Sequence, residues 1–129
     1  MEIVQRLLTK INERDLDAAL SDVAPEAQLD WSASEAPDFG IYRGPEEWGK
    51  WMAGRWEGLS DARFDVAEVI DVPPDTVVLV ARMLGRGRAS GVEIAGLGVT
   101  VWTLRNRQVT GATLYQTKDQ ALKVVGLEE

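Results

Sequence analysis

Arg82 is the residue of this sequence best suited to hold an anionic group within an apolar interior. It lies in the run Val-Val-Leu-Val-Ala-Arg-Met-Leu at 77–84, and a buried arginine is costly unless it is paired. Its guanidinium could hold a ligand carboxylate or an oxyanion through two parallel hydrogen bonds. The alternatives are a structural ion pair with Glu68 or Asp30, or an arginine that reaches solvent at a strand end.

Asp30 and Tyr42 are the side chains that could carry a proton beside Arg82. Asp30 lies in an alternating segment, and neighbouring residues of a strand point to opposite faces. Its carboxylate would therefore enter a pocket only where the strand bulges. Tyr42 belongs to the segment 34–44, where its hydroxyl could contact a ligand at the edge of a pocket. Arg82 with Asp30 or Tyr42 is thus a weak catalytic candidate set.

Tryptophans outnumber the other aromatic residues, five against two tyrosines and two phenylalanines. An aromatic-rich pocket suits a flat or apolar ligand. Trp48 and Trp51 share one broad helical face with Met52 and Trp56, a spacing that ordinary core packing also produces. For Trp31 and Trp102, in strand-like segments, pocket lining and core filling are equally consistent with the sequence.

The composition excludes many kinds of chemistry. The chain has no cysteine and no histidine, which removes disulfides, thiolate catalysis, imidazole general bases and most transition-metal sites. We therefore predict no metal and no cofactor. Fourteen basic residues against 21 acidic residues give a net charge of −7, which argues against a nucleic-acid partner because phosphate binding needs a cationic face.

Length and hydropathy limit the architecture. A chain of 129 residues, 45% hydrophobic and 27% charged, is typical of a single globular domain, here 1–129. The first residues lack the basic segment and apolar core of a signal peptide, and no apolar window is long enough to span a membrane. We expect a cytoplasmic protein with no membrane partner.

The hydrophobic period changes along the chain from helical to strand-like. Helices are predicted over 2–13, over a short segment capped by Asp15 and ended by Pro25, and over 45–59. Strands are predicted over 27–33, 62–72, 76–86, 92–105 and 108–117, with a loop over 34–44 and a closing helix over 119–125. Early helices and late antiparallel strands indicate an α+β fold. Because the late strands are apolar on both faces, both faces must be covered, one by helices and the other by a second subunit.

Five short segments follow one another at characteristic spacing. They are 12–17 (Asn-Glu-Arg-Asp-Leu-Asp), 42–44 (Tyr-Arg-Gly), 87–91 (Gly-Arg-Ala-Ser-Gly), 101–105 (Val-Trp-Thr-Leu-Arg) and 115–127. Their order resembles the SnoaL-like branch of the nuclear transport factor 2-like superfamily, and the resemblance covers essentially the whole chain. One departure is Arg107, where the turn of the family usually carries glycine.

The resemblance implies a strongly curved antiparallel sheet wrapped around the N-terminal helices, a cystatin-like α+β cone with a central pocket. It also implies a homodimer through the outer sheet face. The family fold hosts isomerases, cyclases, epoxide hydrolases, dehydratases and binding proteins, so the pocket residues must decide the function.

Matching the catalytic patterns of the superfamily to this sequence leaves no complete set. The steroid isomerase pattern, a tyrosine and two aspartates, falls on Leu7, Trp31 and Thr100. The epoxide hydrolase pattern retains Arg82 but has leucines in place of its two aspartates, one of them Leu114. Scytalone-type dehydratases need histidines. SnoaL-type cyclases rely on an acid near the C-terminal strands, and the pocket-side positions of those strands hold none.

The same matches place the even-numbered residues of the 92–105 strand in the pocket. Gly96 and Gly98 would then leave space for a ligand. The outward residues would form an apolar dimer face, namely Leu97, Val99, Val101 and Thr103. The predicted ligand-binding set is Leu7, Trp31, Tyr42, Trp48, Met52, Arg82, Gly98, Thr100, Trp102, Leu114 and Gln116.

Three functions remain open at this point. The first is binding of a small hydrophobic molecule in an apolar pocket that lacks the known catalytic acids. The second is an isomerase, cyclase or dehydratase that uses Arg82 as electrophile and Asp30 or Tyr42 as proton carrier. The third is a structural dimerisation module whose pocket is filled by side chains such as Trp31 and Trp102.

Overall fold

The computed structural model describes residues 2–34 and 39–127. The helices are α1 (Glu2–Asn12), α2 (Leu16–Leu20), α3 (Gly44–Gly58) and α4 (Lys118–Val124). The strands are β1 (Val23–Asp30), β2 (Ile41–Arg43), β3 (Leu59–Val72), β4 (Thr76–Gly87), β5 (Glu93–Arg105) and β6 (Gln108–Tyr115). The predicted α+β class, with early helices and late strands, is confirmed. Within the described ranges, no helix is long and apolar enough to cross a membrane.

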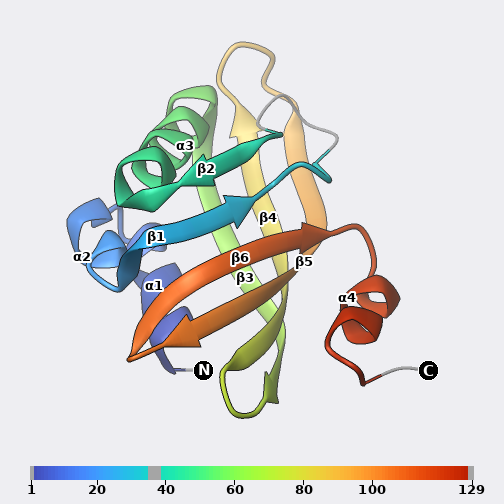
Figure 1. The fold of residues 1–129 in the computed structure, drawn as a ribbon. Coiled ribbons are helices and arrows are strands. Elements are labelled where there is room, and N and C mark those ends of the chain that lie inside the picture. Colours follow the sequence, from blue (N-terminus) through green and yellow to red (C-terminus); the bar gives the residue numbers. More distant parts are fainter. Residues whose placement is uncertain (1, 35–38, 128–129) are drawn as a thin grey trace.

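The strands form one six-stranded sheet in the order β2-β1-β6-β5-β4-β3. Neighbouring strands are antiparallel except β1 and β6, which run parallel. The sheet curves around α1, α2 and α3, while α4 lies on its other side (Figure 1). Two register shifts in the pairing of β3 with β4 contribute to this curvature, because bulges bend a strand and increase its twist. The main core fills the concave side.

The first strand begins earlier than predicted. β1 starts at Val23, so Pro25 lies inside the strand instead of ending the helical region before it. The pairing of β1 with β6 is irregular between Val23 and Gln28. A proline has no N–H to donate to a ladder, and such an interruption tolerates it.

The predicted loop over 34–44 contains a short strand. Residues 41–43 form β2 and pair with β1, Tyr42 opposite Leu29. Three residues between Gly40 and Gly44 are too few to show an alternating pattern, which explains why this strand was missed. The loop positions 35–38 lie outside the described residues.

The corner between α1 and α2 joins the helices to the sheet. The Asn12 side chain donates a hydrogen bond to the Phe64 carbonyl (2.8 Å) and accepts one from the Phe64 N–H (2.9 Å). Asp15 caps α2 as predicted, accepting a hydrogen bond from a backbone N–H of that helix at 3.2 Å. Between them, the Arg14 guanidinium lies 5.0 Å from the centre of the Trp56 ring. The 12–17 segment therefore fixes α1 and α2 against β3 and α3.

Helix α3 is held at both ends. At its N-terminus the Glu47 carboxylate accepts a hydrogen bond from the Arg43 N–H at 2.9 Å. At its C-terminus the Arg88 guanidinium donates two hydrogen bonds to the Trp56 carbonyl, at 3.2 and 3.1 Å. A cation at this end satisfies a carbonyl that has no partner within the helix and complements the helix dipole. The β4–β5 hairpin thereby positions the aromatic face of α3.

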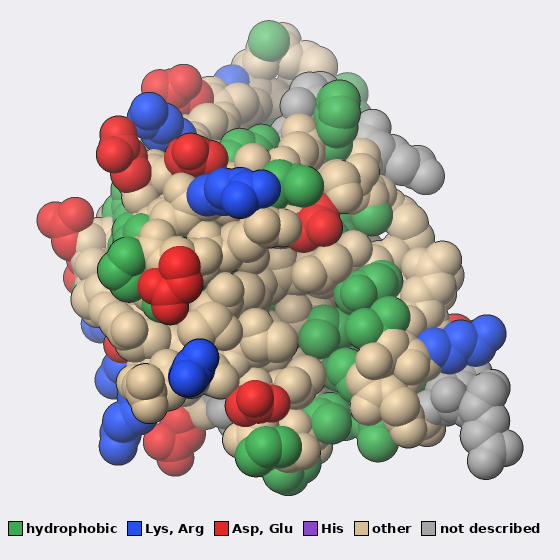
Figure 2. Space-filling model, viewed as in Figure 1, with side chains coloured by type: hydrophobic (Ala, Val, Ile, Leu, Met, Phe, Trp, Pro, Cys, Tyr) green, Lys and Arg blue, Asp and Glu red, His purple; other side chains and the backbone are tan. Residues whose placement is uncertain are grey.

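The convex face of the sheet is partly covered by the chain itself. Val99 and Val101 of β5 are buried there against Ala121 of α4, and hydrophobic side chains gather around α4 in Figure 2. Both valines point outward as predicted, but helix α4 covers them, so their burial requires no second subunit. Leu97 on the same face remains 59% exposed.

Candidate functional site

An apolar cavity of about 40 Å³ lies between α1, α2, α3 and the concave face of the sheet. All three helices line it, together with residues of β1, β3, β4 and β5. Such a volume holds on the order of one to three water molecules. The cavity is therefore a narrow space within the main core.

Most of the predicted ligand-binding residues line this cavity, namely Leu7, Trp31, Trp48, Met52, Gly98, Thr100 and Trp102. Gly98, Thr100 and Trp102 of β5 thus face the cavity, as predicted from the parity of that strand, whereas Gly96, predicted to face it as well, is not among the lining residues. Trp51, expected to be a core or rim residue, lines the cavity as well.

Arg82 is not in the cavity, so its predicted place in the pocket is wrong. On β4 the odd-numbered residues Leu79, Ala81 and Met83 line the cavity, and side chains alternate along a strand. Arg82 therefore points to the convex face, where it pairs in register with Asp65 and is exposed. The alternative of an arginine that reaches solvent describes its position.

Asp30 also faces away from the cavity. It lies between Leu29, which lines the cavity, and Trp31, and it pairs in register with Thr113 of β6. Its carboxylate accepts hydrogen bonds from the N–H of Ser32 at 3.1 Å and from the hydroxyl of the same residue at 2.5 Å. No bulge turns this side chain inward, so Arg82 and Asp30 do not form a catalytic set at the cavity.

Three further predicted residues are not among the residues that line the cavity. Tyr42 is half-buried, with its ring centre 6.3 Å from that of Trp51. Leu114 is 6% exposed and packs beside Gly98. Gln116 is exposed, and its amide donates a hydrogen bond to the carbonyl of Ala33. Tyr42 and Leu114 therefore pack behind lining residues of the cavity, whereas Gln116 lies at the surface.

The space predicted beside Gly98 is filled. A Cβ atom at this position would lie 2.6 Å from the Cε atom of Met83, so the methionine methyl group already occupies the space that glycine leaves. Gly96 would place a Cβ with nothing within 4 Å. Met83 was absent from the predicted set, and its odd-numbered place on β4 was the signal that could have identified it.

Two pairs of tryptophans line the cavity edge to face. Trp31 and Trp51 have ring centres 4.9 Å apart at 62°, and Trp48 and Trp102 have ring centres 6.1 Å apart at 62°. The indole N–H of Trp102 donates a hydrogen bond to the Thr100 hydroxyl at 2.7 Å. The indole Nε1 atoms of Trp48 and Trp51 are buried and have no hydrogen-bond partner among the described residues.

The lining limits the chemistry that the cavity can perform. Among the described residues, it contains no Asp, Glu, Lys or Arg, and its one hydroxyl belongs to Thr100. Within the same ranges, no group of three or more acidic side chains could hold a metal ion. The cavity can therefore enclose an apolar group, but it presents no carboxylate for proton transfer.

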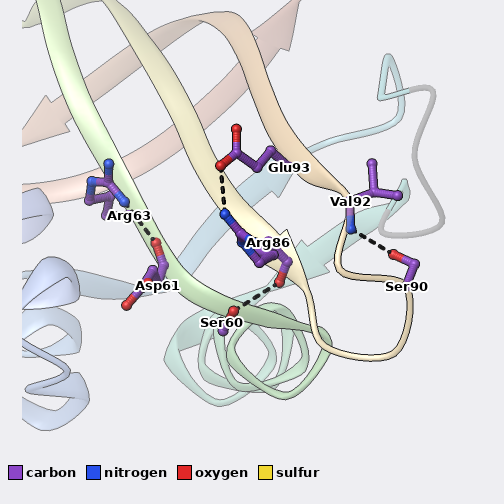
Figure 3. Close-up of polar contacts among 7 residues, drawn as sticks. All are labelled: Ser60, Asp61, Arg63, Arg86, Ser90, Val92 and Glu93. Carbon is purple, nitrogen blue, oxygen red and sulfur yellow. Dashed lines mark hydrogen bonds and ion pairs between the residues drawn. The ribbon is translucent and has the colours of Figure 1, made fainter.

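A second hollow, of about 280 Å³, opens to solvent where β3, β4 and β5 meet near the β4–β5 hairpin. Figure 3 shows its polar groups paired with one another: Arg86 with Glu93 at 2.6 Å, and Arg63 with the carbonyl of Asp61 at 3.2 Å. The side chains of Arg86 and Glu93 are both more than half exposed. This hollow is larger than the apolar cavity. It is nevertheless a weaker binding site, because its charged side chains are exposed to solvent and already paired with one another.

Solved structures of other proteins share the fold of this chain. A nuclear transport factor 2-like protein from Burkholderia thailandensis E264 matches with a TM-score of 0.79 and 22% identity, over 98% of this chain and 94% of that one. A hypothetical protein with a ketosteroid isomerase-like fold from Catenulispora acidiphila, in complex with trimethylamine, matches with a TM-score of 0.77 and 17% identity. That match covers 98% of this chain and 93% of the other. A Mycobacterium tuberculosis protein in complex with estradiol-17β-hemisuccinate matches with a TM-score of 0.76 and 16% identity. That match covers 91% of this chain and 92% of the other.

The curved sheet around an enclosed cavity defines the nuclear transport factor 2-like class of folds. The model of the SnoaL-like domain matches residues 4–112, and the chain belongs to that family. The resemblance inferred from the sequence is therefore confirmed. A sequence search of curated proteins found no match, and structures of such low identity establish the fold alone.

Proposed function

We propose that this protein binds a small, largely apolar molecule in the cavity between its three N-terminal helices and the sheet. The observation that carries the proposal is the lining, which is aromatic and aliphatic apart from the Thr100 hydroxyl. Sites for small molecules are concave and mostly apolar, with few polar groups. The complexes of fold relatives with estradiol-17β-hemisuccinate and with trimethylamine agree with such a role.

Binding requires the cavity to widen. Its volume of about 40 Å³ is far below the roughly 300–1,000 Å³ of sites for drug-sized ligands. Met52 and Met83 are the lining residues with unbranched, flexible side chains. Withdrawal of the Met83 methyl group from beside Gly98 would enlarge the cavity without moving the backbone.

A structural module with a filled cavity is the second candidate. The small volume favours it, since tryptophans and methionines already occupy most of the cone. The catalytic alternative built on Arg82 and Asp30 has no such support, because both side chains point away from the cavity.

We also propose that the protein is a homodimer, with one domain over 1–129 in each subunit. We further propose that it is cytoplasmic and has no nucleic-acid or membrane partner. Leu97, 59% exposed on the convex face, is the residue of the predicted dimer face that a second subunit would cover. The net charge of −7 opposes association with phosphate backbones and anionic lipids.

A binding titration tests the proposed function. The probe is α-methylstyrene, a small aromatic hydrocarbon, and the readout is intrinsic tryptophan fluorescence with the melting temperature as a second measure. Met83→Ala should bind the probe more tightly than the unaltered protein, because it removes the side chain that narrows the cavity. Arg82→Ala is the matched control, since the neighbouring residue points to the opposite face, and it should bind as the unaltered protein does. Absence of saturable binding to every variant would support the filled module instead.

A further inference from the structure

A ligand that fills more than the cavity's 40 Å³ can enter only where part of the wall moves aside. Most of the described lining residues are buried, and four are partly exposed at the surface of the protein. These are Leu16 and Leu20 of α2, Phe64 of β3 and Met83 of β4. An entry route therefore leads either past α2 or past the pair formed by Phe64 and Met83.

Helix α2 packs closely on α3, which makes the first route the more difficult one. A Cβ atom on Gly49 of α3 would lie 3.1 Å from Leu20 Cδ1 and 3.6 Å from Leu16 Cδ2, so both leucines lie directly against the α3 backbone. Opening the wall here requires the two helices to separate. Motions of packed helices are collective, whereas rotation of a single side chain is local and faster.

The second route is closed by two side chains from adjacent strands. Phe64 and Met83 are partners in the register of β3 with β4, and both line the cavity. The backbone at Phe64 is fixed, because the Asn12 side chain donates to its carbonyl at 2.8 Å and accepts from its N–H at 2.9 Å. Opening at this point therefore requires rotation of the Phe64 ring, with the flexible Met83 side chain bending aside.

Arg55 of α3 lies against the Phe64 ring. Its Cζ atom is 5.6 Å from the centre of that ring and 5.4 Å from the centre of the Trp51 ring, one helical turn earlier. Both rings line the cavity, whereas the half-buried Arg55 does not. A guanidinium close to an aromatic ring is attracted to it, so Arg55 joins the wall formed by α3 to the wall formed by β3.

We propose that the Phe64 ring is the gate of the cavity and that Arg55 is the latch that holds this gate closed. The inference rests on the proposed binding function and adds the route by which a ligand enters and leaves. The contact of Arg55 with the Phe64 ring is worth about two- to fivefold in the equilibrium between closed and open gate. Because the closed gate has this contact in both the free and the occupied protein, the latch governs the rates of binding and release and not the affinity.

Stopped-flow binding of α-methylstyrene, followed by tryptophan fluorescence, tests the gate. Arg55→Ala should raise the association and dissociation rate constants together, each about two- to fivefold, and leave the dissociation constant within about twofold. Arg14→Ala is the matched control and should change neither rate, because Arg14 lies 5.0 Å from the ring of Trp56, which does not line the cavity. A weaker affinity of Arg55→Ala with an unchanged association rate constant would make Arg55 a binding residue and overturn the proposal.

A second readout uses the unaltered protein and does not depend on a variant folding. The chain has two phenylalanines, so labelling with 4-fluorophenylalanine gives two ¹⁹F signals, one from Phe64 and one from Phe39, which is 63% exposed. The Phe64 signal should show exchange between a closed and an open state, at an opening rate equal to the limiting rate of binding at high probe concentration. The Phe39 signal should not show this exchange. If the probe binds while the Phe64 signal shows no exchange, the gate is wrong and the binding function stands. If the probe binds to no variant, the proposed function fails and the gate fails with it.

Discussion

Replacing Gly98 with alanine probes how closely the cavity wall is packed. The new Cβ atom would lie 2.6 Å from Met83 Cε and 3.6 Å from Leu114 Cδ1. Carbon atoms in contact are about 3.5–4.0 Å apart, so the Met83 methyl group must withdraw by about 1 Å. The contact with Leu114 is already ordinary, which makes Met83 the residue that has to move.

Two effects of opposite sign set the size of the change. Overpacking of a core costs about 1–3 kcal/mol, and replacing a glycine whose conformation alanine can adopt gains about 0.4–1 kcal/mol through the unfolded state. Because the atom that must move is the far end of a flexible side chain, we expect Gly98→Ala to lower the free energy of unfolding by no more than about 1 kcal/mol. Gly96→Ala is the matched control, since its Cβ meets nothing within 4 Å, and it should be neutral or slightly stabilising.

Urea unfolding of a double-mutant cycle measures the coupling. In a Met83→Ala background the crowding atom is gone, so Gly98→Ala should behave like Gly96→Ala. The interaction energy between positions 83 and 98 should therefore be about 1–2 kcal/mol, as for residues in contact. An equal destabilisation by Gly98→Ala with and without Met83 would refute the account of how the cavity is filled.

Three further predictions concern single residues. Thr100→Val should lower the free energy of unfolding by about 1–3 kcal/mol, because the Trp102 N–H loses its buried acceptor; thermal unfolding with no shift would contradict this. Arg82→Leu should leave probe affinity unchanged in the fluorescence titration and alter stability by no more than about 0.5 kcal/mol, as expected of a surface position; a clear loss of affinity would return Arg82 to the binding site. Leu97→Glu should shift a homodimer toward monomer in light scattering, and an unaltered protein that is already monomeric would remove the proposed interface.

Local sequence patterns predicted the helices and strands well, because each pattern arises from residues within a single helix or strand. The apolar spacing from Ile3 to Ile11 corresponds to α1, and Asp15 is the cap of α2. These features depend on neighbours a few residues away, and a sequence displays them without knowledge of the tertiary structure. The cavity side of β5, with Gly98, Thr100 and Trp102, was predicted instead by matching the strand to the catalytic patterns of the superfamily.

The errors arose where distant parts of the chain meet. Matching Arg82 to a family pattern identified its strand but not its face, which the pairing of β4 with β5 decides. The space beside Gly98 is filled by Met83 from the adjacent strand, and the outward valines of β5 are covered by a helix that follows β6. The unpaired indoles of Trp48 and Trp51 depend on side-chain geometry, which helical spacing does not reveal.

Native mass spectrometry of the purified protein, followed by extraction of what it carries, tests the central claim most directly. We expect an added mass from a small, largely apolar organic molecule, released on denaturation and replaceable by α-methylstyrene. A protein that carries no added mass, and that does not take up α-methylstyrene offered in excess, would contradict the proposed binding function and identify the cone as a filled structural core.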